Sequence, residues 1–370
     1  MKEKRLRLSD RWSVLLALGI LLAAGCYALL WPHAEFSDAE RRLLSAAPSA
    51  PSLTAWTTDR ETESWLSDRI PFRPVLVGLD SCVQAATGRR TLLGSWPVAG
   101  VLIEPPTAGS AGTAQRRLEQ FGALAGKLGI PWRLAVPRSH GWLLREKMNV
   151  LMRPMYEAEQ DIYGVLEQDP HFLDVLPEGT DPSAVYYRTD HHWTLRGAYL
   201  AYRALCEADQ LPVLRMEDFR LSRFENFFGT TRSRSGLPAF RGDTLECAEP
   251  RDPVCMTLED GSRYDRLIFP EQAETYDGYA VYLNGNHGLL EIINENAPGG
   301  TLLVFKDSYA NCLLPMLAAD YRRIVAVDAR YYAGTFSEAA AAAGKADELL
   351  FVYSPDSLVN DTSVAGKAGR

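Results

Sequence analysis

Apolar residues form one long run near the N-terminus and shorter periodic runs elsewhere. The segment Ser13 to Trp31 (SVLLALGILLAAGCYALLW) carries no charged residue. A helix needs about 20 predominantly apolar residues to cross a bilayer, so this run predicts a membrane-spanning helix. Basic residues precede the run and acidic residues follow it, which predicts a cytoplasmic N-terminus with the rest of the chain outside.

A cleavable signal is the competing interpretation of the same run. Leu22-Ala23-Ala24-Gly25-Cys26 resembles a lipoprotein cleavage box, which would make Cys26 a lipidated residue. The apolar run continues past Cys26 to Trp31, however, whereas a processed signal usually turns polar at this point. We therefore expect residues 1–32 to be a basic tail followed by an uncleaved anchor.

The last third of the chain alternates between strand and helix patterns. Buried-strand patterns cover Thr301–Phe305, Arg323–Asp328 and Glu348–Tyr353, with helical segments ending near Leu317 and spanning Ser337–Lys345 between them. Strands that alternate with helices at this spacing are typical of a parallel sheet with right-handed crossovers. The pattern predicts an α/β fold in which helices cover both faces of a mainly parallel sheet.

The preceding residues divide into two regions. Residues 33–92 are expected to be a spacer followed by helices, and residues 93–370 to form the main domain. Predicted elements are paired helices in Thr58–Ala86, a hairpin in Leu93–Glu104, helices in Ala114–Leu128 and Met155–Gln168, and a strand in Trp132–Pro137. Residues 219–277 show no clear period and are expected to form an irregular insertion.

Composition narrows the function only slightly. The chain has 370 residues, 46% hydrophobic content and a net charge of −8, with no basic run beyond the N-terminus, which argues against nucleic acid as a partner. None of the six cysteines forms a CxxC pair. Outside the cytoplasm Cys247 and Cys255 could close a short loop, and isolated thiols are equally compatible with the sequence.

The most informative stretch is Asp190-His191-His192-Trp193. It precedes an apolar helical pattern that starts near Leu195, with Thr194 as the expected N-cap, so the block should lie in a loop feeding a helix. A carboxylate two residues from an imidazole fits an acid–base pair, a metal site or a hydrogen-bonded loop anchor. For a metal site Asp190, His191 and His192 lack the helical spacing of HExxH, which makes that signal weak.

Ser308 lies where a predicted strand leads into a helix. In parallel α/β sheets reactive groups collect at the carboxyl ends of strands, and a helix start offers backbone N–H groups to an oxyanion. A lone serine at such a junction is usually an N-cap. Together with Asp190 and His192 it becomes a candidate triad, with Ser308 as nucleophile, His192 as general base and Asp190 as the group that orients the imidazole.

Several motifs together resemble a known family. They are RTDHHWTLRGAY, FKDSYANCLLPML, VAVDARYY, SDAERRLL, LSDRIPFR, FFGTTRSRSGL and YLNGNHG. The chain resembles the bacterial DHHW proteins, which are similar to alginate O-acetylation proteins of the AlgX and AlgJ type. The resemblance implies an SGNH-hydrolase-like fold and the roles given above for Ser308, His192 and Asp190.

Other site candidates surround these blocks. The backbone N–H of Tyr309 and the side chain of Asn286 are candidate oxyanion donors. Candidate substrate-binding residues are Arg188 and Lys306, which could meet an anionic glycan, and Trp193, which could stack on a sugar. For each of these the structural alternatives are turn, ion-pair or core roles.

The resemblance implies a membrane-anchored, extracytoplasmic O-acetyltransferase that modifies a polysaccharide, with a membrane-bound acyl-donor protein as partner and no cofactor. The residues themselves do not distinguish transfer to a sugar from hydrolysis by water. An acetyl esterase of the same fold and a catalytically idle glycan-binding or assembly protein are the alternatives.

Overall fold

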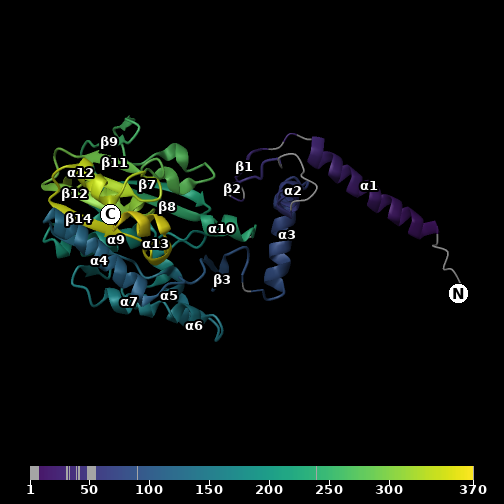
Figure 1. Ribbon diagram of the computed structural model, residues 1–370, viewed down its shortest axis with the longest axis horizontal. Helices are drawn as coiled ribbons and strands as arrows, with labels where there is room; N and C mark the ends of the chain where they lie inside the picture. The colour runs from purple at the N-terminus through teal and green to yellow at the C-terminus, as the bar shows by residue number, and fades with distance from the viewer. Residues whose placement is uncertain are drawn as a thin grey trace. The chain divides into compact units, whose positions relative to one another are not determined.

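The computed structural model describes residues 8–30, 32, 34–38, 40, 42–47, 56–89, 91–238 and 240–369. The chain divides into two compact units, which are described separately (Figure 1). Unit 1 comprises residues 1–92 and 236–238, and unit 2 comprises residues 93–235 and 239–370. Residues 1–7 of the predicted basic tail and part of the predicted spacer lie outside the described residues.

Unit 1 contains the apolar helix and two further helices. Its elements are α1 (Leu8–Leu30), β1 (Phe36–Ser37), β2 (Arg42–Leu43), α2 (Trp56–Asp68) and α3 (Arg73–Ala86). Within α1, Trp12–Leu30 is long and apolar enough to cross a membrane, which fits an anchor and a signal sequence alike. α2 and α3 are the two helices predicted within Thr58–Ala86, and Phe72, just before α3, lies in the left-handed region at φ 59°.

Ion pairs join the SDAERRLL and LSDRIPFR motifs of unit 1. Asp68 accepts hydrogen bonds from the Arg42 guanidinium and from the Ser45 N–H, and Arg42 holds the pKa of Asp68 well below its usual range. Glu40 pairs with Arg73 at 2.7 Å. These contacts join β1 and β2 to the helices.

Unit 2 is built on a mixed sheet of eight strands. In spatial order these are β10 (Arg263–Tyr264), β9 (Cys255–Leu258), β11 (Leu289–Ile293), β13 (Tyr321–Asp328), β12 (Gly299–Lys306), β14 (Glu348–Val352), β5 (Trp132–Ala135) and β6 (Phe172–Leu173). The run from β13 to β6 is parallel, and β10, β9 and β11 pair antiparallel at the other side.

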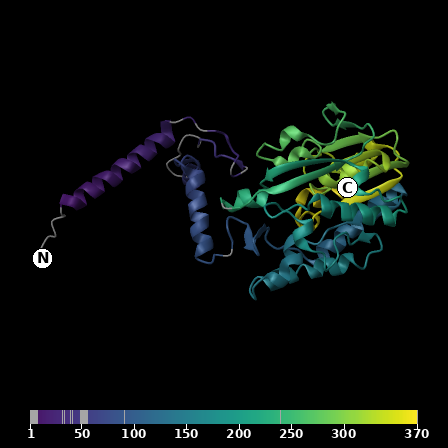
Figure 2. The same ribbon diagram turned by 180° about the vertical axis from the view of Figure 1, so that it is seen from behind.

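Alternation along the buried strands sends side chains into two separate cores. In β12, Leu302 and Val304 join the core shared with helices α9 (Leu195–Ala208) and α11 (Ala310–Leu317). Leu303 and Phe305 face the opposite core. That core is covered by α4 (Ala111–Leu128), α7 (Gln160–Leu166), α12 (Phe336–Ala343), α13 (Pro355–Asn360) and α14 (Thr362–Lys367) (Figures 1 and 2).

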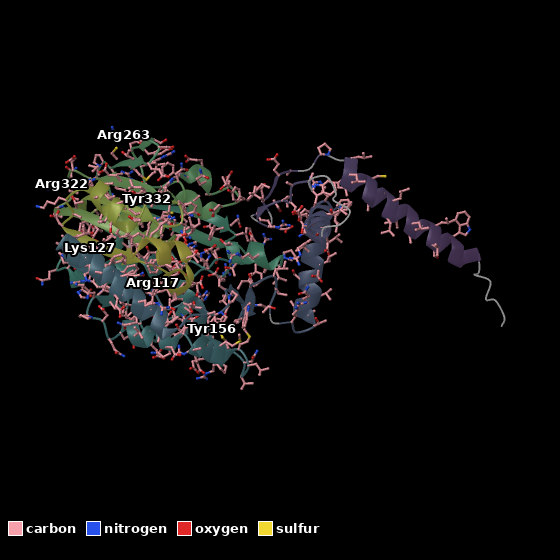
Figure 3. The ribbon with its side chains drawn as sticks, in the orientation of Figure 1. Arg117, Lys127, Tyr156, Arg263, Arg322 and Tyr332 are labelled. Atoms are coloured by element: carbon pink, nitrogen blue, oxygen red, sulfur yellow. The ribbon has the colours of Figure 1, made fainter. Side chains whose placement is uncertain are left out.

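The helices of the second layer are locked to the sheet and to each other. Phe121 of α4 stacks on Phe351 of β14 with ring centroids 3.9 Å apart. Arg117 of α4, labelled in Figure 3, is buried and donates from Nε to the Leu358 carbonyl of α13 at 3.0 Å. The prediction of an α/β fold with a mainly parallel central sheet between helical layers is confirmed.

The smaller elements change the prediction for residues 155–168, and the structure shows the state of Cys247 and Cys255. They are β3 (Trp96–Val98), β4 (Val101–Ile103), α5 (His140–Leu144), α6 (Arg153–Glu157), α8 (Pro182–Val185), β7 (Arg220–Phe227), α10 (Thr230–Ser235), β8 (Asp243–Glu249) and four 3-10 turns, Arg145–Lys147, Met216–Asp218, Pro270–Gln272 and Gly278–Val281. The helix predicted over 155–168 is in fact α6 followed by α7. Cys247 and Cys255 are both free thiols.

The prediction of an irregular insertion at 219–277 is wrong. β7 and β8 form an antiparallel pair within it, α10 lies between them in the chain, and β9 and β10 extend the main sheet. β7 is mostly solvent-exposed, so its residues lack the alternating pattern that marks a half-buried strand.

Candidate active site

Asp190, His192 and Ser308 form a continuous hydrogen-bonded chain. The Nε2 atom of His192 lies 2.8 Å from Ser308 Oγ, and its Nδ1 lies 2.5 Å from Asp190 Oδ1. All three residues are buried, Ser308 least so at 9% exposure. A carboxylate on Nδ1 fixes the tautomer that leaves Nε2 free to accept a proton from the serine.

Local structure places His192 and Ser308 at one edge of the sheet. A bridge between Tyr186 and Trp193 closes the loop that holds Asp190 and His192, and Thr194 caps α9 through the Gly197 N–H. Ser308 follows the carboxyl end of β12 and precedes α11. The site therefore lies where parallel sheets collect their functional groups.

The insertion between β7 and β8 holds the carboxylate in place. Asp190 Oδ2 accepts hydrogen bonds from the N–H of Thr230 at 2.7 Å and from its hydroxyl at 3.1 Å. Asp243 of β8 accepts from the N–H and hydroxyl of Thr189, at 2.9 and 2.6 Å, and so fixes the preceding residue. Burial opposes ionisation of Asp190, but the imidazoles of His192 and His191 and hydrogen bonds from His192 hold its pKa well below the usual range.

Aromatic rings enclose His192. Tyr279 stacks flat on His192, with ring centroids 3.8 Å apart and an interplanar angle of 4°. The ring centroid of His191 also lies 3.8 Å from that of His192. Burial lowers the pKa of His192 below its ordinary value, with the neighbouring His191 adding to the effect. The imidazole is therefore neutral near pH 7, the form that can act as a base.

The two predicted oxyanion donors differ in their surroundings. The backbone N–H of Tyr309 already donates to Asp307 Oδ1 at 2.9 Å, so the structure does not leave this predicted donor available. Asp307 Oδ2 also accepts from the Ser354 N–H at 2.8 Å, which braces the turn against the segment after β14. The backbone N–H of Ser308 has no hydrogen-bond partner among the described residues.

Asn286 stands at the end of a buried polar relay. Lys306 Nζ donates to Asn311 Oδ1 at 2.7 Å, and Asn311 Nδ2 donates to Asn286 Oδ1 at 2.9 Å. A lysine has only donors, so it orients the first amide, which in turn orients the second. The amide nitrogen of Asn286 is left to donate elsewhere.

The three substrate-binding candidates have structural partners. Trp193 is fully buried and donates from Nε1 to the Tyr309 carbonyl at 2.9 Å, which fits a core role and not stacking on a sugar. Lys306 has no exposed side-chain surface and lies 3.8 Å from Asp328. Arg188 is partly exposed, but it pairs with Asp243 at 3.0 Å. None of the three is a free cation or an open aromatic surface.

A metal centre fits these residues poorly. Asp190, His191 and His192 each place one potential ligand atom within 4.8 Å of the others. Both oxygens of Asp190 and both ring nitrogens of His192, however, are engaged in hydrogen bonds within the site. This bonding suits a carboxylate that orients an imidazole better than a set of metal ligands.

Fold and site together define an α/β protein with a buried Asp–His–Ser arrangement at the carboxyl edge of its sheet. Residues 176–327, which include all three of these residues, match the family model described as DHHW protein. The match confirms the resemblance to the DHHW family that the motifs indicate.

Two solved structures with TM-scores of 0.60 or more share the fold at 19–20% sequence identity. A DHHW family protein from Eubacterium siraeum superposes with a TM-score of 0.62 at 20% identity, covering 75% of this chain and 96% of that one. Bacillus cereus PatB1 superposes with a TM-score of 0.60 at 19% identity, covering 73% of this chain and 98% of that one. The O-acetyltransferase domain of Pseudomonas putida AlgJ has a TM-score of 0.41 at 15% identity, with 74% of this chain and 98% of that one covered. No curated protein matches the chain.

Two contributors to the site were missed from the sequence. Thr230 lies within residues 219–277, which show no clear period, and the motif FFGTTRSRSGL is the one sequence signal that includes it. Tyr279 precedes the YLNGNHG motif, and no local pattern marks its ring as a partner of His192. Both contacts cross long stretches of sequence, which spacing alone cannot reveal.

Proposed function

We propose that this chain is a membrane-anchored, extracytoplasmic O-acetyltransferase that acts on a cell-surface or secreted polysaccharide. The observation that carries the proposal is the hydrogen-bonded chain from Asp190 through His192 to Ser308. The DHHW match and the apolar helix near the N-terminus support it. A membrane-bound acyl-donor protein is the expected partner.

The first half of the reaction forms an acyl-enzyme. His192 Nε2 takes the proton of Ser308 as Oγ attacks the acyl carbonyl, and the leaving group then receives that proton. Asp190 stabilises the imidazolium that exists in between. The N–H of Ser308, which has no partner among the described residues, and the side-chain amide of Asn286 are the donors proposed to stabilise the oxyanion.

The second half transfers the acetyl group. A sugar hydroxyl gives its proton to His192 and attacks the acyl carbon, and the bond to Ser308 Oγ breaks as the serine recovers a proton. Water in place of the sugar would make the chain an esterase. The two outcomes use the same residues and differ only in which nucleophile reaches the acyl-enzyme.

Turnover of a chromogenic acetyl ester by the purified full chain in detergent tests this proposal. Ser308→Ala should lower kcat by at least about 1,000-fold, because the remaining groups cannot form the acyl-enzyme. Ser262→Ala, in the turn between β9 and β10, is the matched control and should leave turnover unchanged. With an oligosaccharide acceptor present, acetylated sugar identifies a transferase and free acetate an esterase.

Two results would contradict the proposal. Undiminished turnover by Ser308→Ala would place the nucleophile elsewhere. No turnover by the unmodified chain on any acyl ester or glycan acceptor would favour a catalytically idle glycan-binding or assembly protein.

A further inference from the structure

A cavity of about 280 Å³ opens beside the candidate triad. Tyr309, next to the nucleophile, and His191, next to the base, form part of its wall. Tyr309 donates from its hydroxyl to the His191 carbonyl at 2.5 Å, which fixes this wall. The volume lies near the lower end of the about 300–1,000 Å³ typical of small-molecule sites.

The rest of the wall comes from segments that follow neighbouring strands. His140 and Ser139 follow β5, and Ser354 and Asp356 follow β14. Tyr156 of α6, labelled in Figure 3, closes one side and donates to the Glu104 carbonyl at 2.5 Å. Ser308 follows β12, so cavity and nucleophile share the same edge of the sheet.

His140 is a buried polar group turned toward this space. It lines the cavity at 6% exposure and stacks on Tyr186 at 4.7 Å, and its Nδ1 has no hydrogen-bond partner in the described part of the chain. Burial lowers the pKa of His140 to about 3, so the ring carries no charge. A neutral imidazole can both donate and accept, and an unpartnered one is a group that a ligand can satisfy.

Charges around the cavity disfavour an anion. Within the described chain its lining has one arginine, Arg234, and no lysine. Arg234 is already paired with Glu104 at 2.9 Å. Asp356 adds a second carboxylate, which is exposed and, among the described residues, accepts a hydrogen bond only from Asn360, at 2.7 Å. A sugar carboxylate here would meet an uncompensated negative charge and no free cation.

From these contacts we infer that the cavity binds the acceptor as a neutral sugar unit, with hydroxyl or acetamido groups, and not as a uronic acid. Asp356 and Glu104 accept from sugar hydroxyls, His140 meets a polar substituent, and the proline and tyrosine side chains of the wall contact the ring. This inference rests on the proposed function, because a bound sugar is an acceptor only if the chain transfers an acetyl group. It replaces the expectation that Arg188 or Lys306 meets an anionic glycan.

Binding to the full-length Ser308→Ala chain in detergent tests the inference without any turnover. Calorimetric titration uses tetra-N-acetylchitotetraose and cellotetraose as neutral probes and tetragalacturonate as the anionic probe. At least one neutral probe should bind, and the uronate should bind at least tenfold more weakly.

Substitutions locate the site. In the same background Asp356→Asn should weaken the neutral probe by about tenfold, as expected for loss of a charged hydrogen bond. Asp356→Lys should strengthen tetragalacturonate binding. Asp252→Asn, an exposed carboxylate outside the cavity, is the matched control and should change neither affinity.

The contrary results are distinct from failure of the proposed function. Failure of both neutral probes to bind, equal binding of the uronate, or insensitivity to both Asp356 substitutions overturns the inference. Each of these is compatible with Ser308-dependent ester turnover. Conversely, neutral-probe binding that responds to Asp356 supports the cavity assignment even in a chain that lacks turnover.

Discussion

At the scale of single residues, the site depends on how His192 is surrounded. The carboxylate of Asp190 lies on one ring nitrogen, Ser308 on the other, and Tyr279 covers one face of the ring. The carboxylate favours the protonated ring, whereas burial favours the neutral ring, and burial is the larger influence on its pKa. The imidazole of His192 is therefore neutral near pH 7, the form that can accept a proton.

This balance predicts the acid side of the pH profile. Protonated His192 cannot take the serine proton, so kcat/KM should fall as pH drops through the pKa of His192, which lies below its ordinary value of 6.5. Activity at pH 6.5 should therefore remain above half its maximum. A pH series of acetyl-ester turnover measures this, and an acid midpoint above pH 7 would contradict a lowered pKa.

At the scale of elements, the segment from β7 to β8 supports the loop that holds Asp190 and His192. Thr230 at the start of α10 holds one oxygen of Asp190, and Asp243 of β8 holds Thr189. Gly229 packs against the carboxylate so closely that a Cβ there would lie 2.1 Å from the Asp190 Cβ. This close approach requires glycine.

Gly229→Ala is therefore expected to displace Asp190 and lower kcat by about 100-fold, the order of loss expected for a misplacement of about 1 Å. Gly164→Ala in α7 is the matched control, because nothing lies within 4 Å of its added Cβ. Circular dichroism should show both variants folded. Full activity in Gly229→Ala would mean that the insertion does not position the carboxylate.

The elements that carry the site differ in how well the sequence predicts them. The strand after residue 300 and the helix after Thr194 have strong local periodicity, so the positions of Ser308 and His192 relative to elements were predictable. The strands β7 and β8 were not predictable. β7 is mostly exposed, so it leaves no apolar pattern in the sequence, and it is stabilised by its pairing with β8. The sequence left a core role and sugar stacking open for Trp193, because the contact that buries its ring, with Tyr309, is 116 residues away in the chain.

At the scale of the whole molecule, the apolar helix is expected to hold the chain at the membrane. The chain should sediment with membranes and be released by detergent but not by high salt. Mass spectrometry of the N-terminus separates the alternatives: an intact first segment supports an anchor, a new N-terminus at Cys26 with a lipid mass supports a lipoprotein, and cleavage without lipid would contradict anchoring.

The most direct test of the central claim is mass spectrometry of the full chain after exposure to an activated acetyl ester. The proposed mechanism predicts one added acetyl group, mapped by fragmentation to Ser308 and absent from Ser308→Ala and from a chain with His192→Ala. An acetyl group on a different residue, or equal labelling of the Ser308→Ala chain, would contradict it.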